Sequence, residues 1–388
     1  MSGEGQTMNK VYYDMIYLLS CGANNRIPEQ DFINNLEMEH IFQLSRAHSL
    51  EALIGTTLKN AGVALPKEWN ECILKAIRKV MLFDAERTKL FTFMEENAIW
   101  YLPLKGIVLK DYYPVIGMRQ MSDNDILFDA DFGDKVQKYM ESQGYKSVVV
   151  GTGTHDVYEK EPVYNFELHR ILYAPMDWNN WEAYYRDIKK KLIRNSATSY
   201  GYHFTDEDFY VYIVVHAYKH YVRSGTGLRT LLDFYMYLKA KEQKLDFSYI
   251  ERECEHLGIE EFELQSRKLC KKVFQKSDLK TVKEFEDLLT EEEKEMLLYY
   301  LSSGVYGTLE RGVRNSMKQF AKSSGKKSKF AYLLMRIFPG MEAFGQYPII
   351  RKHKWLLPVG WVLRFFDIVF NKSRRTHAIR ILDAIRKV

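Results

Sequence analysis

The sequence predicts an α+β fold: a small module with a mixed sheet, flanked by helical regions on its N-terminal and C-terminal sides. Two observations predict it. Up to residue 98, and again from residue 177, apolar residues recur at the three- and four-residue spacing of helices. Between these regions, short apolar runs alternate with polar residues at the period of two that strands require, and two helical segments interrupt the runs. Short strands mixed with helices are typical of a compact α/β module.

Length and composition allow this organisation. The chain has 388 residues, of which 46% are hydrophobic and 28% charged, as in an ordinary globular protein of two or three domains. Its four cysteines are scattered without a Cys-x-x-Cys pair, so neither a disulfide framework nor a zinc site is indicated. We predict four regions: an N-terminal helical region (1–98), the α/β module (99–176), a second helical domain (177–310) and a basic, aromatic-rich helical extension (311–388).

The elements of the α/β module follow from local signals. Pro114 closes the first helix and Gly144 stops the second, since proline cannot continue a helix and glycine suits a helix C-terminus. Gly151 and Gly153 turn one strand into the next. The expected order is strand 99–104, helix 107–113, strand 125–128 and helix 131–143, followed by strands 145–150, 155–159 and 163–170.

Two aspartates stand one residue apart where the second predicted strand begins. Side chains alternate faces along a strand, so Asp123 and Asp125 point the same way. Asn124, at a position where we expect an apolar residue to pack beneath the sheet, points the other way. On the last predicted strand, Glu167 and His169 share the polar face. If the two strands are neighbours, Glu167 is a third carboxylate in the same site. The alternative is that Asp-Asn-Asp forms a turn, because these residue types favour turns.

The carboxylates and the turn before them suit a metal and a phosphate. Three carboxylates on adjacent strands can hold two Mg²⁺ ions, which stabilise the attacking and leaving oxygens of a displacement at phosphorus. The turn at Lys105 and Gly106 opens onto a helix, whose exposed backbone N–H groups and positive dipole suit a phosphate. Lys105 either contacts that phosphate or is a solvated turn residue. Arg119 neutralises phosphate, pairs with Asp123, or forms a purely structural salt bridge.

The second helical domain contains a polar block on two helices. His216 and His220 are four residues apart on the first helix, and Arg229 and Asp233 are four apart on the second, so each pair shares a face. A short connection makes the helices antiparallel, and the two pairs could then converge. Ala217 occupies the glutamate position of a His-Glu-x-x-His zinc motif, so we prefer polar contacts to a substrate or an interdomain hydrogen bond over metal ligation. Arg229 and Asp233 alternatively form an intrahelical ion pair.

Taken together, these motifs resemble a known superfamily. A Lys-Gly turn, a short helix ending in Tyr-Tyr-Pro, Arg119, an Asp-Asn-Asp at a strand start and a later Phe-Glu-Leu-His strand resemble the nucleotidyltransferases that include DNA polymerase β. The order looks closer still to the bacterial uncharacterised nucleotidyltransferase family, in which Lys-Gly stands where better-known members have Gly-Ser. The His-x-x-x-His helix followed by Gly, Leu-Arg and Asp also looks like that family's downstream helical block. The resemblance covers roughly residues 95–240.

The resemblance implies a function. Superfamily members transfer a nucleoside monophosphate from an NTP to an acceptor hydroxyl, with Mg²⁺ on the Asp-x-Asp pair and a third acid activating the hydroxyl. It implies that Asp123, Asp125 and Glu167 are catalytic and bind two Mg²⁺ or Mn²⁺ ions, with His169 orienting Glu167 or the substrate. The implied nucleotide-binding residues are Lys105, Gly106, Arg119, His169, His216, His220, Arg229 and Asp233. The acceptor is a sugar or small metabolite, a protein hydroxyl or an RNA end.

The C-terminal extension differs from the rest of the chain in charge. From Lys322 onward there are fifteen Lys and Arg residues against three acids, a local balance of +12 in a chain whose net charge is +5. Aromatic residues such as Trp355 and Phe366 lie between these charges. The extension is a solvated, partly buried helical segment, an RNA-binding surface or a surface that docks on an anionic membrane.

Two other classes of function stay open: a nucleotide-binding regulatory or interaction protein without turnover, and an RNA-binding adaptor that acts through the basic extension. The presence of all three acids favours the transferase. The N-terminus lacks the basic start and apolar core of a secretory signal, and no stretch reaches the roughly 18 apolar residues of a membrane span. The sequence therefore predicts a cytoplasmic protein, peripheral to the membrane if the extension docks on lipid.

Overall fold

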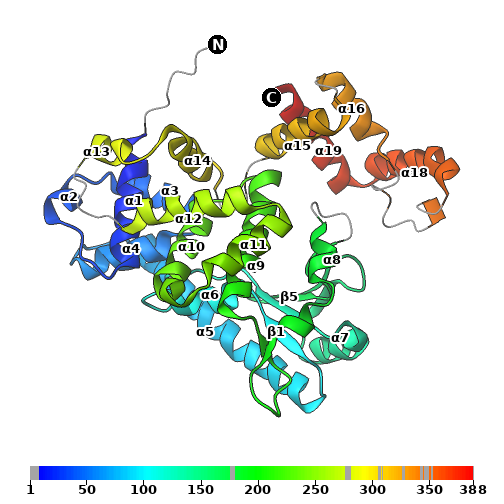
Figure 1. Cartoon of the computed structure of the whole chain (residues 1–388), viewed down its shortest axis with the longest axis horizontal. Coiled ribbons are helices and arrows are strands. Elements are labelled where there is room, and N and C mark those ends of the chain that lie inside the picture. The colour runs from blue at the N-terminus through cyan, green and yellow to red at the C-terminus, as the bar shows by residue number, and fades with distance from the viewer. Residues whose placement is uncertain are drawn as a thin grey trace. The chain divides into compact units, whose positions relative to one another are not determined.

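The computed structural model describes residues 8–174, 180–275, 281–304, 307, 309–325, 328–340, 344, 349–350 and 353–387. The chain forms two compact units, which are described separately: Met1–His216 with Leu228–Leu301, and Ala217–Gly227 with Ser302–Val388. The predicted α+β class, with a mixed sheet and helical flanks, is confirmed, and 66% of the structure is helical (Figure 1). The finer division predicted at residues 98, 176 and 310 stays a prediction.

Helices precede the sheet, as the apolar spacing predicts. They are α1 (Lys10–Ala23), α2 (Gln30–Asn34), α3 (Met38–Ala47), α4 (Glu51–Asn60) and α5 (Lys67–Glu96). Helix α1 begins after Asn9, whose side chain accepts a hydrogen bond from the Val11 N–H, as N-cap residues do. Helix α5 has 30 residues and buries Phe83, Leu90 and Met94 along one side. This side faces the sheet and contributes Val80, Phe83, Leu90 and Met94 to its core.

The main sheet has five strands: β1 (Tyr101–Pro103), β2 (Asn124–Phe128), β3 (Lys146–Val149), β4 (His155–Lys160) and β5 (Tyr164–His169), in the order β1-β2-β5-β4-β3. Strands β2 and β5 are parallel, and the other pairings in this sheet are antiparallel. Between the strands lie α6 (Gly106–Leu109) with the 3-10 turn η1 (Lys110–Tyr112), and the 3-10 turn η2 (Ala130–Phe132) with α7 (Gly133–Ser142). The elements predicted between residues 99 and 170 are therefore confirmed, with small shifts of their ends.

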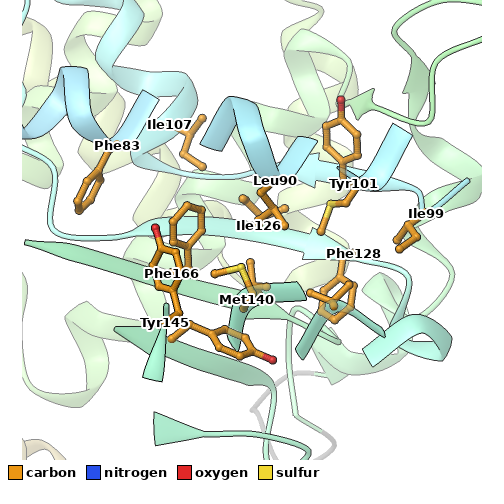
Figure 2. Close-up of a cluster of buried hydrophobic side chains, with 14 of the residues drawn as sticks. Phe83, Leu90, Ile99, Tyr101, Ile107, Ile126, Phe128, Met140, Tyr145 and Phe166 are labelled. Carbon is orange, nitrogen blue, oxygen red and sulfur yellow. The ribbon is translucent and has the colours of Figure 1, made fainter. Parts of the chain in front are cut away.

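The two faces of the sheet have different chemistry, because side chains alternate along each strand. Ile126, Phe128 and Phe166 point to one face and pack against Leu90 of α5 and Met140 of α7 in a single buried cluster. Figure 2 shows these side chains gathered with the other members of the cluster. The opposite face carries the odd-numbered residues of β2 and β5, including the predicted acids. Apolar burial on one face thus fixes which residues the other face presents.

From residue 177 the sequence analysis predicts helices alone, and this is wrong in one place. Strands β6 (Ile193–Arg194) and β7 (Tyr202–His203) form a short antiparallel hairpin beside β1. The connection between them is held by Glu95 at the end of α5. Its carboxylate accepts hydrogen bonds from the Ser199 hydroxyl at 2.6 Å and from the Tyr200 N–H at 2.7 Å. A pairing that depends on a side chain about a hundred residues away leaves no local periodic signal.

The remaining elements include both helices of the predicted polar block, α9 and α10. In chain order they are α8 (Trp181–Tyr185), the 3-10 turn η4 (Ile188–Lys191), α9 (Asp206–Arg223), α10 (Leu228–Lys241), the 3-10 turn η5 (Glu242–Lys244), α11 (Phe247–Leu257), α12 (Glu260–Gln275), α13 (Val282–Asp287) and α14 (Glu291–Leu301). Helix α10 is buried along most of its length and packs against α12 and α14.

The C-terminal unit contains α15 (Leu309–Ser324), α16 (Lys329–Ile337), the 3-10 turn η7 (Lys354–Leu356), α18 (Leu357–Phe370) and α19 (Lys372–Lys387). Its described core is small: Val313, Tyr332, Ala384 and Ile385 form one cluster, and Phe344 and Ile350 are also buried. Many of its apolar side chains are therefore exposed. Among the helices of the described residues, none is long and apolar enough to cross a membrane.

Candidate active site

The structure brings the three predicted acids together on one face of the sheet. In the parallel register of β2 and β5, Asp125 lies directly opposite Glu167. Asp123 precedes β2 and interacts electrostatically with both of these carboxylates. Asp125 is only 3% exposed, whereas Asp123 and Glu167 are half-buried. The two strands are therefore neighbours, which is the condition that the sequence analysis posed, and their pairing is parallel.

Asn124 lies on the opposite face, where an apolar residue was expected, and the structure gives a polar reason for it. Its Oδ1 accepts a hydrogen bond at 2.9 Å from Nη1 of Arg87 on α5, and Arg87 Nη2 lies 2.5 Å from Asp84 Oδ1. In place of the expected apolar contact beneath the strand, the buried amide of Asn124 joins β2 to α5 through this hydrogen bond. A buried polar group needs such a partner, since an unpaired one is destabilising.

Lys105 and His169 both contact Asp125. The Lys105 ammonium lies 2.6 Å from Asp125 Oδ1, and His169 Nε2 lies 2.9 Å from the same oxygen. Lys105 occupies the turn before α6 with a positive φ of 45°, and the neighbouring Leu104 N–H donates to the Asp125 carbonyl at 3.0 Å. Lys105 is thus a counter-ion of the acid cluster rather than a solvated turn residue. His169, which was predicted to orient Glu167 or the substrate, makes its hydrogen bond to Asp125, and its role toward a substrate stays a prediction.

The electrostatics separate the three acids. Burial and the charge of Asp125 raise the pKa of Asp123 to about 7. Burial also acts on Asp125, but Lys105 and His169 outweigh it and hold the pKa of Asp125 well below its usual range. Burial and the charge of Asp125 raise the pKa of Glu167. Burial lowers the pKa of His169 to about 4, so its ring is neutral at pH 7. The Lys105 ammonium pairs with Asp125, and Lys79 and Arg119 act electrostatically on Asp123. Since Arg119 is already paired with Asp233, three crowded carboxylates favour a further positive charge.

His155 is a member of the site that the sequence analysis missed. In the antiparallel pairing of β4 and β5 it lies directly opposite His169, and their ring centroids are 5.0 Å apart. His155 Nε2 lies 3.9 Å from Glu167 Oε2. A usable signal was present, because folding the predicted strands 155–159 and 163–170 into a hairpin about residue 162 places residue 155 opposite residue 169.

Arg119 forms a structural ion pair, one of its three predicted alternatives. Its Nε donates to Asp233 Oδ1 at 2.8 Å and its Nη2 to Asp233 Oδ2 at 2.9 Å, while the Tyr113 hydroxyl donates to Asp233 Oδ1 at 2.7 Å. The predicted intrahelical pairing of Asp233 with Arg229 is wrong, because Asp233 reaches across to the loop before β2. Arg229 Nη1 instead lies 3.4 Å from the carbonyl oxygen of Gln120.

Gly106 is required by this ion pair. A Cβ on Gly106 would lie 2.5 Å from Arg119 Nη1 and 2.9 Å from Met121 Sδ. The expectation of exposed N–H groups at the start of α6 is wrong for three of them. The N–H groups of residues 107–109 donate to the carbonyls of Leu104 and Lys105. The lack of a side chain at Gly106 therefore accommodates Arg119, and the first turn bonds mainly to itself.

The histidines of the polar block lie on α9. The His216 ring lies 6.4 Å from that of Tyr212, centroid to centroid, and His220 follows one turn later. The predicted convergence of His216 and His220 with Arg229 and Asp233 stays a prediction. Of these four residues, Asp233 is joined to the α/β module through the Arg119 pair described above.

Comparisons with known proteins agree with this geometry. No curated protein and no solved structure matches the chain. A family described as "uncharacterised nucleotidyltransferase" matches residues 34–275, which is more than half of the chain and extends beyond the residues that carried the resemblance. The matched range contains the whole sheet, the acid cluster, both histidines that face it and the Arg119–Asp233 pair. The chain therefore belongs to the uncharacterised nucleotidyltransferase family.

Proposed function

We propose that the protein transfers a nucleoside monophosphate from an NTP to an acceptor hydroxyl, in the manner of the nucleotidyltransferase superfamily that includes DNA polymerase β. Family membership supports nucleotidyl transfer in general. The observation that carries the specific proposal is the register that sets Asp125 opposite Glu167, with Asp123 beside them. Three acids on adjacent parallel strands are the donor set that this chemistry needs.

The residues present fit two Mg²⁺ or Mn²⁺ ions. Asp123, Asp125 and Glu167 offer six carboxylate oxygens, the donor type that these ions prefer, and burial together with the charge of Asp125 raises the pKa of Asp123 to about 7. When bound, the ions would neutralise the phosphates and stabilise the attacking and leaving oxygens. Lys105 already supplies one positive charge at Asp125, and the same ammonium lies at the turn where the sequence analysis expects the phosphates.

The protein's own groups divide the remaining work. Glu167, with its raised pKa, accepts the proton of the acceptor hydroxyl as that oxygen bonds to the α-phosphorus and the bond to the β-phosphate oxygen breaks, releasing pyrophosphate. His169 holds Asp125 in place through its hydrogen bond. Lys105 and Gly106 form the phosphate side of the site, and His216, His220 and Arg229 contact the nucleotide. Arg119 and Asp233 position the turn at Gly106 and α10.

A titration calorimetry experiment tests this proposal. The full chain is titrated with non-hydrolysable ATP, GTP, CTP and UTP analogues, with and without Mg²⁺, beside a variant that carries Asp123→Ala and Asp125→Ala. A matched control is Glu159→Gln, which removes an exposed carboxylate from the same face of the sheet outside the cluster. We expect metal-dependent binding of a nucleotide by the wild type and the control, and its loss in the double variant.

Binding that ignores both Mg²⁺ and the aspartates would contradict the proposal. Metal-dependent binding without turnover on any sugar, protein or RNA acceptor would instead favour a nucleotide-binding regulatory protein that has the fold without the activity. The acid cluster does not define the class of acceptor, because the cluster would contact only the reacting hydroxyl. The same acceptor panel identifies that class.

We further propose that the C-terminal unit docks on an anionic membrane surface. Exposed apolar side chains line α18, among them Phe365 at 65% and Phe370 at 79%, and Trp355 just before it is 75% exposed. A cavity of about 1350 Å³ between α16, α18 and α19 has a mostly apolar lining that includes Phe338 and Trp361, with Arg336 and Arg364 among its polar members. An apolar cavity of this kind, lined by aliphatic as well as aromatic side chains, suits the burial of acyl chains, and the +12 charge from Lys322 onward suits anionic head groups.

Vesicle sedimentation tests the docking surface. We expect the chain to sediment with phosphatidylserine vesicles and not with phosphatidylcholine vesicles, and to lose this binding with Phe365→Ser and Phe370→Ser together. Ile27→Ser with Leu74→Ser is the matched control, because it removes two equally exposed apolar side chains from the other unit. Salt-sensitive binding of single-stranded RNA, with no affinity for either vesicle, would contradict docking on lipid and support the RNA-binding alternative.

A further inference from the structure

Two imidazoles and a carboxylate form a compact group beside the acid cluster. Each of His155, Glu167 and His169 offers one ligand atom, and these three atoms lie within 4.8 Å of one another. The residues share one face of the sheet, since His155 of β4 lies opposite His169 of β5 and Glu167 is two residues before His169. The set is distinct from the three carboxylates, with which it has only Glu167 in common.

The hydrogen bonds leave one ring nitrogen of each histidine available. His169 Nε2 lies 2.9 Å from the ionised Asp125, which can only accept, so Nε2 carries the proton and Nδ1 carries the lone pair. His169 Nδ1 is buried in a side chain that is 7% exposed, and it has no hydrogen-bond partner in the described structure. His155 Nδ1 lies 3.1 Å from the Thr154 hydroxyl, which has lone pairs to accept its proton. In that tautomer Nε2, the atom nearest Glu167, carries the second lone pair.

This arrangement is the one that metal-binding histidines require. A ligating histidine donates its other N–H to a carboxylate or another acceptor, which fixes the tautomer and the ring orientation. Asp125 performs this role for His169, and the Thr154 hydroxyl is placed to accept the Nδ1 proton of His155. The strand ends are also fixed in place. The Arg170 N–H donates to the Thr154 carbonyl at 2.9 Å, and Arg170 Nη2 lies 2.8 Å from Asp156 Oδ2.

We propose that His155, Glu167 and His169 bind one first-row transition-metal dication, of the series from Mn²⁺ to Zn²⁺, in preference to Mg²⁺. Imidazole nitrogen suits the later metals of this series, whereas Mg²⁺ takes oxygen ligands. Three protein ligands leave at least one coordination position for a substrate oxygen or water, as in catalytic rather than structural sites. The half-buried His155 and Glu167 leave access from solvent.

The site would set the metal preference of the acid cluster. Because Glu167 belongs to both donor sets, the ion on its side would have nitrogen ligands, while the ion on Asp123 and Asp125 would have oxygen ligands alone. That consequence for transfer rests on the proposed function. The binding of the metal itself does not, since it requires neither a nucleotide nor turnover.

Spectroscopic titration with Co²⁺ tests the inference directly. The chelator-treated full chain, free of any histidine tag, is titrated with Co²⁺ and followed by its visible absorption, and calorimetry gives the affinities for Zn²⁺, Mn²⁺ and Mg²⁺ without nucleotide. We expect one Co²⁺ per chain with ligand-field bands of nitrogen coordination. Zn²⁺ should bind at least about 100-fold more tightly than Mg²⁺.

The variants separate ligands from their supports. His155→Asn removes one ligand, whose side chain is 34% exposed, and should abolish the Co²⁺ bands. Thr154→Val should weaken binding about tenfold, as loss of a supporting hydrogen bond does. His40→Asn is the control, because it removes an exposed imidazole from α3. Co²⁺ binding that His155→Asn leaves unchanged, or a Zn²⁺ affinity equal to that for Mg²⁺, would overturn the proposal. Failure of nucleotide binding with intact Co²⁺ bands would reject the proposed function and leave the metal site standing.

Discussion

Two groups of buried charge in the first unit differ in how their charges are balanced. Arg119 and Asp233 form one cation–anion pair with two matched hydrogen bonds, and the Tyr113 hydroxyl completes the carboxylate's partners. The acid cluster instead has three carboxylates, of which Asp125 pairs with the Lys105 ammonium and Asp123 interacts electrostatically with Lys79. A balanced pair joins elements of the fold, here the loop before β2 and α10. An unbalanced cluster destabilises the fold locally and is preorganised for a ligand of opposite charge.

The largest expected effect on stability is at the balanced pair. Arg119→Met should lower the free energy of unfolding by about 3–5 kcal/mol, because it leaves Asp233 buried without its cation. The double variant Arg119→Met with Asp233→Leu should recover most of this loss, since apolar residues of similar size can replace a buried pair. Urea denaturation of the single and double variants measures both. A loss below about 1 kcal/mol in Arg119→Met would contradict the structural role of the pair.

His48, a buried side chain that is neutral at pH 7, makes the stability of the same unit depend on pH. His48 Nε2 lies 3.1 Å from the Leu301 carbonyl oxygen and its Nδ1 accepts from the Leu228 N–H at 3.2 Å, and burial lowers its pKa to about 4. The His48 ring binds a proton more readily in the unfolded chain than in the folded one. Its contribution to the free energy of unfolding is therefore fully present above pH 6.5 and is lost as the pH falls toward 4. Between pH 7.5 and 5, His48 should account for a loss of about 2 kcal/mol.

Denaturation of the wild type and of His48→Gln at both pH values isolates this contribution. The variant lacks the titrating group, so its stability should fall less between the two pH values, even if it is less stable at each. An equal fall in both proteins would show that His48 titrates normally in the folded state.

The smallest of the stability effects is at Gly106. Gly106→Ala brings a methyl group within 2.5 Å of the guanidinium of Arg119 and should cost about 1–2 kcal/mol. Most of this cost should vanish in the Arg119→Met background, because the methionine side chain can move aside. Thermal or urea denaturation of the four proteins of this cycle measures the coupling. Strictly additive effects would mean that Gly106 and Arg119 do not meet, and that Gly106 serves only the phosphate site.

The acid cluster was predictable from sequence because its geometry follows from strand periodicity. The spacing of Asp123 and Asp125 fixes their common face, and the chain order places Glu167 on a strand of the same module. Lys105 was identified, but its contact with Asp125 was not, since a turn conformation with positive φ has no signature in a lysine. His155 could have been found by counting residues across the hairpin, because the register of a hairpin depends only on residues close in the sequence.

The partners of Arg119, Asn124 and Glu95 could not be predicted from the sequence. Each pairs with a side chain or backbone group from a distant part of the chain, on α10, α5 and the β6–β7 connection respectively. Such contacts depend on tertiary packing, for which periodicity carries no information. The intrahelical pairing of Arg229 with Asp233 was plausible on helical spacing alone, and the bidentate geometry offered by Arg119 outweighed it.

The most direct test of the central claim follows the α-phosphate. The full chain is incubated with Mg²⁺, an acceptor panel and NTP labelled either at the α- or at the γ-phosphate, beside Asp125→Asn and the control Glu159→Gln. The account predicts that α-label moves to an acceptor with one pyrophosphate released per transfer, that Glu159→Gln retains this activity, and that Asp125→Asn loses at least about 1000-fold while remaining folded. Transfer of the γ-label, or transfer of the α-label that Asp125→Asn leaves intact, would contradict it.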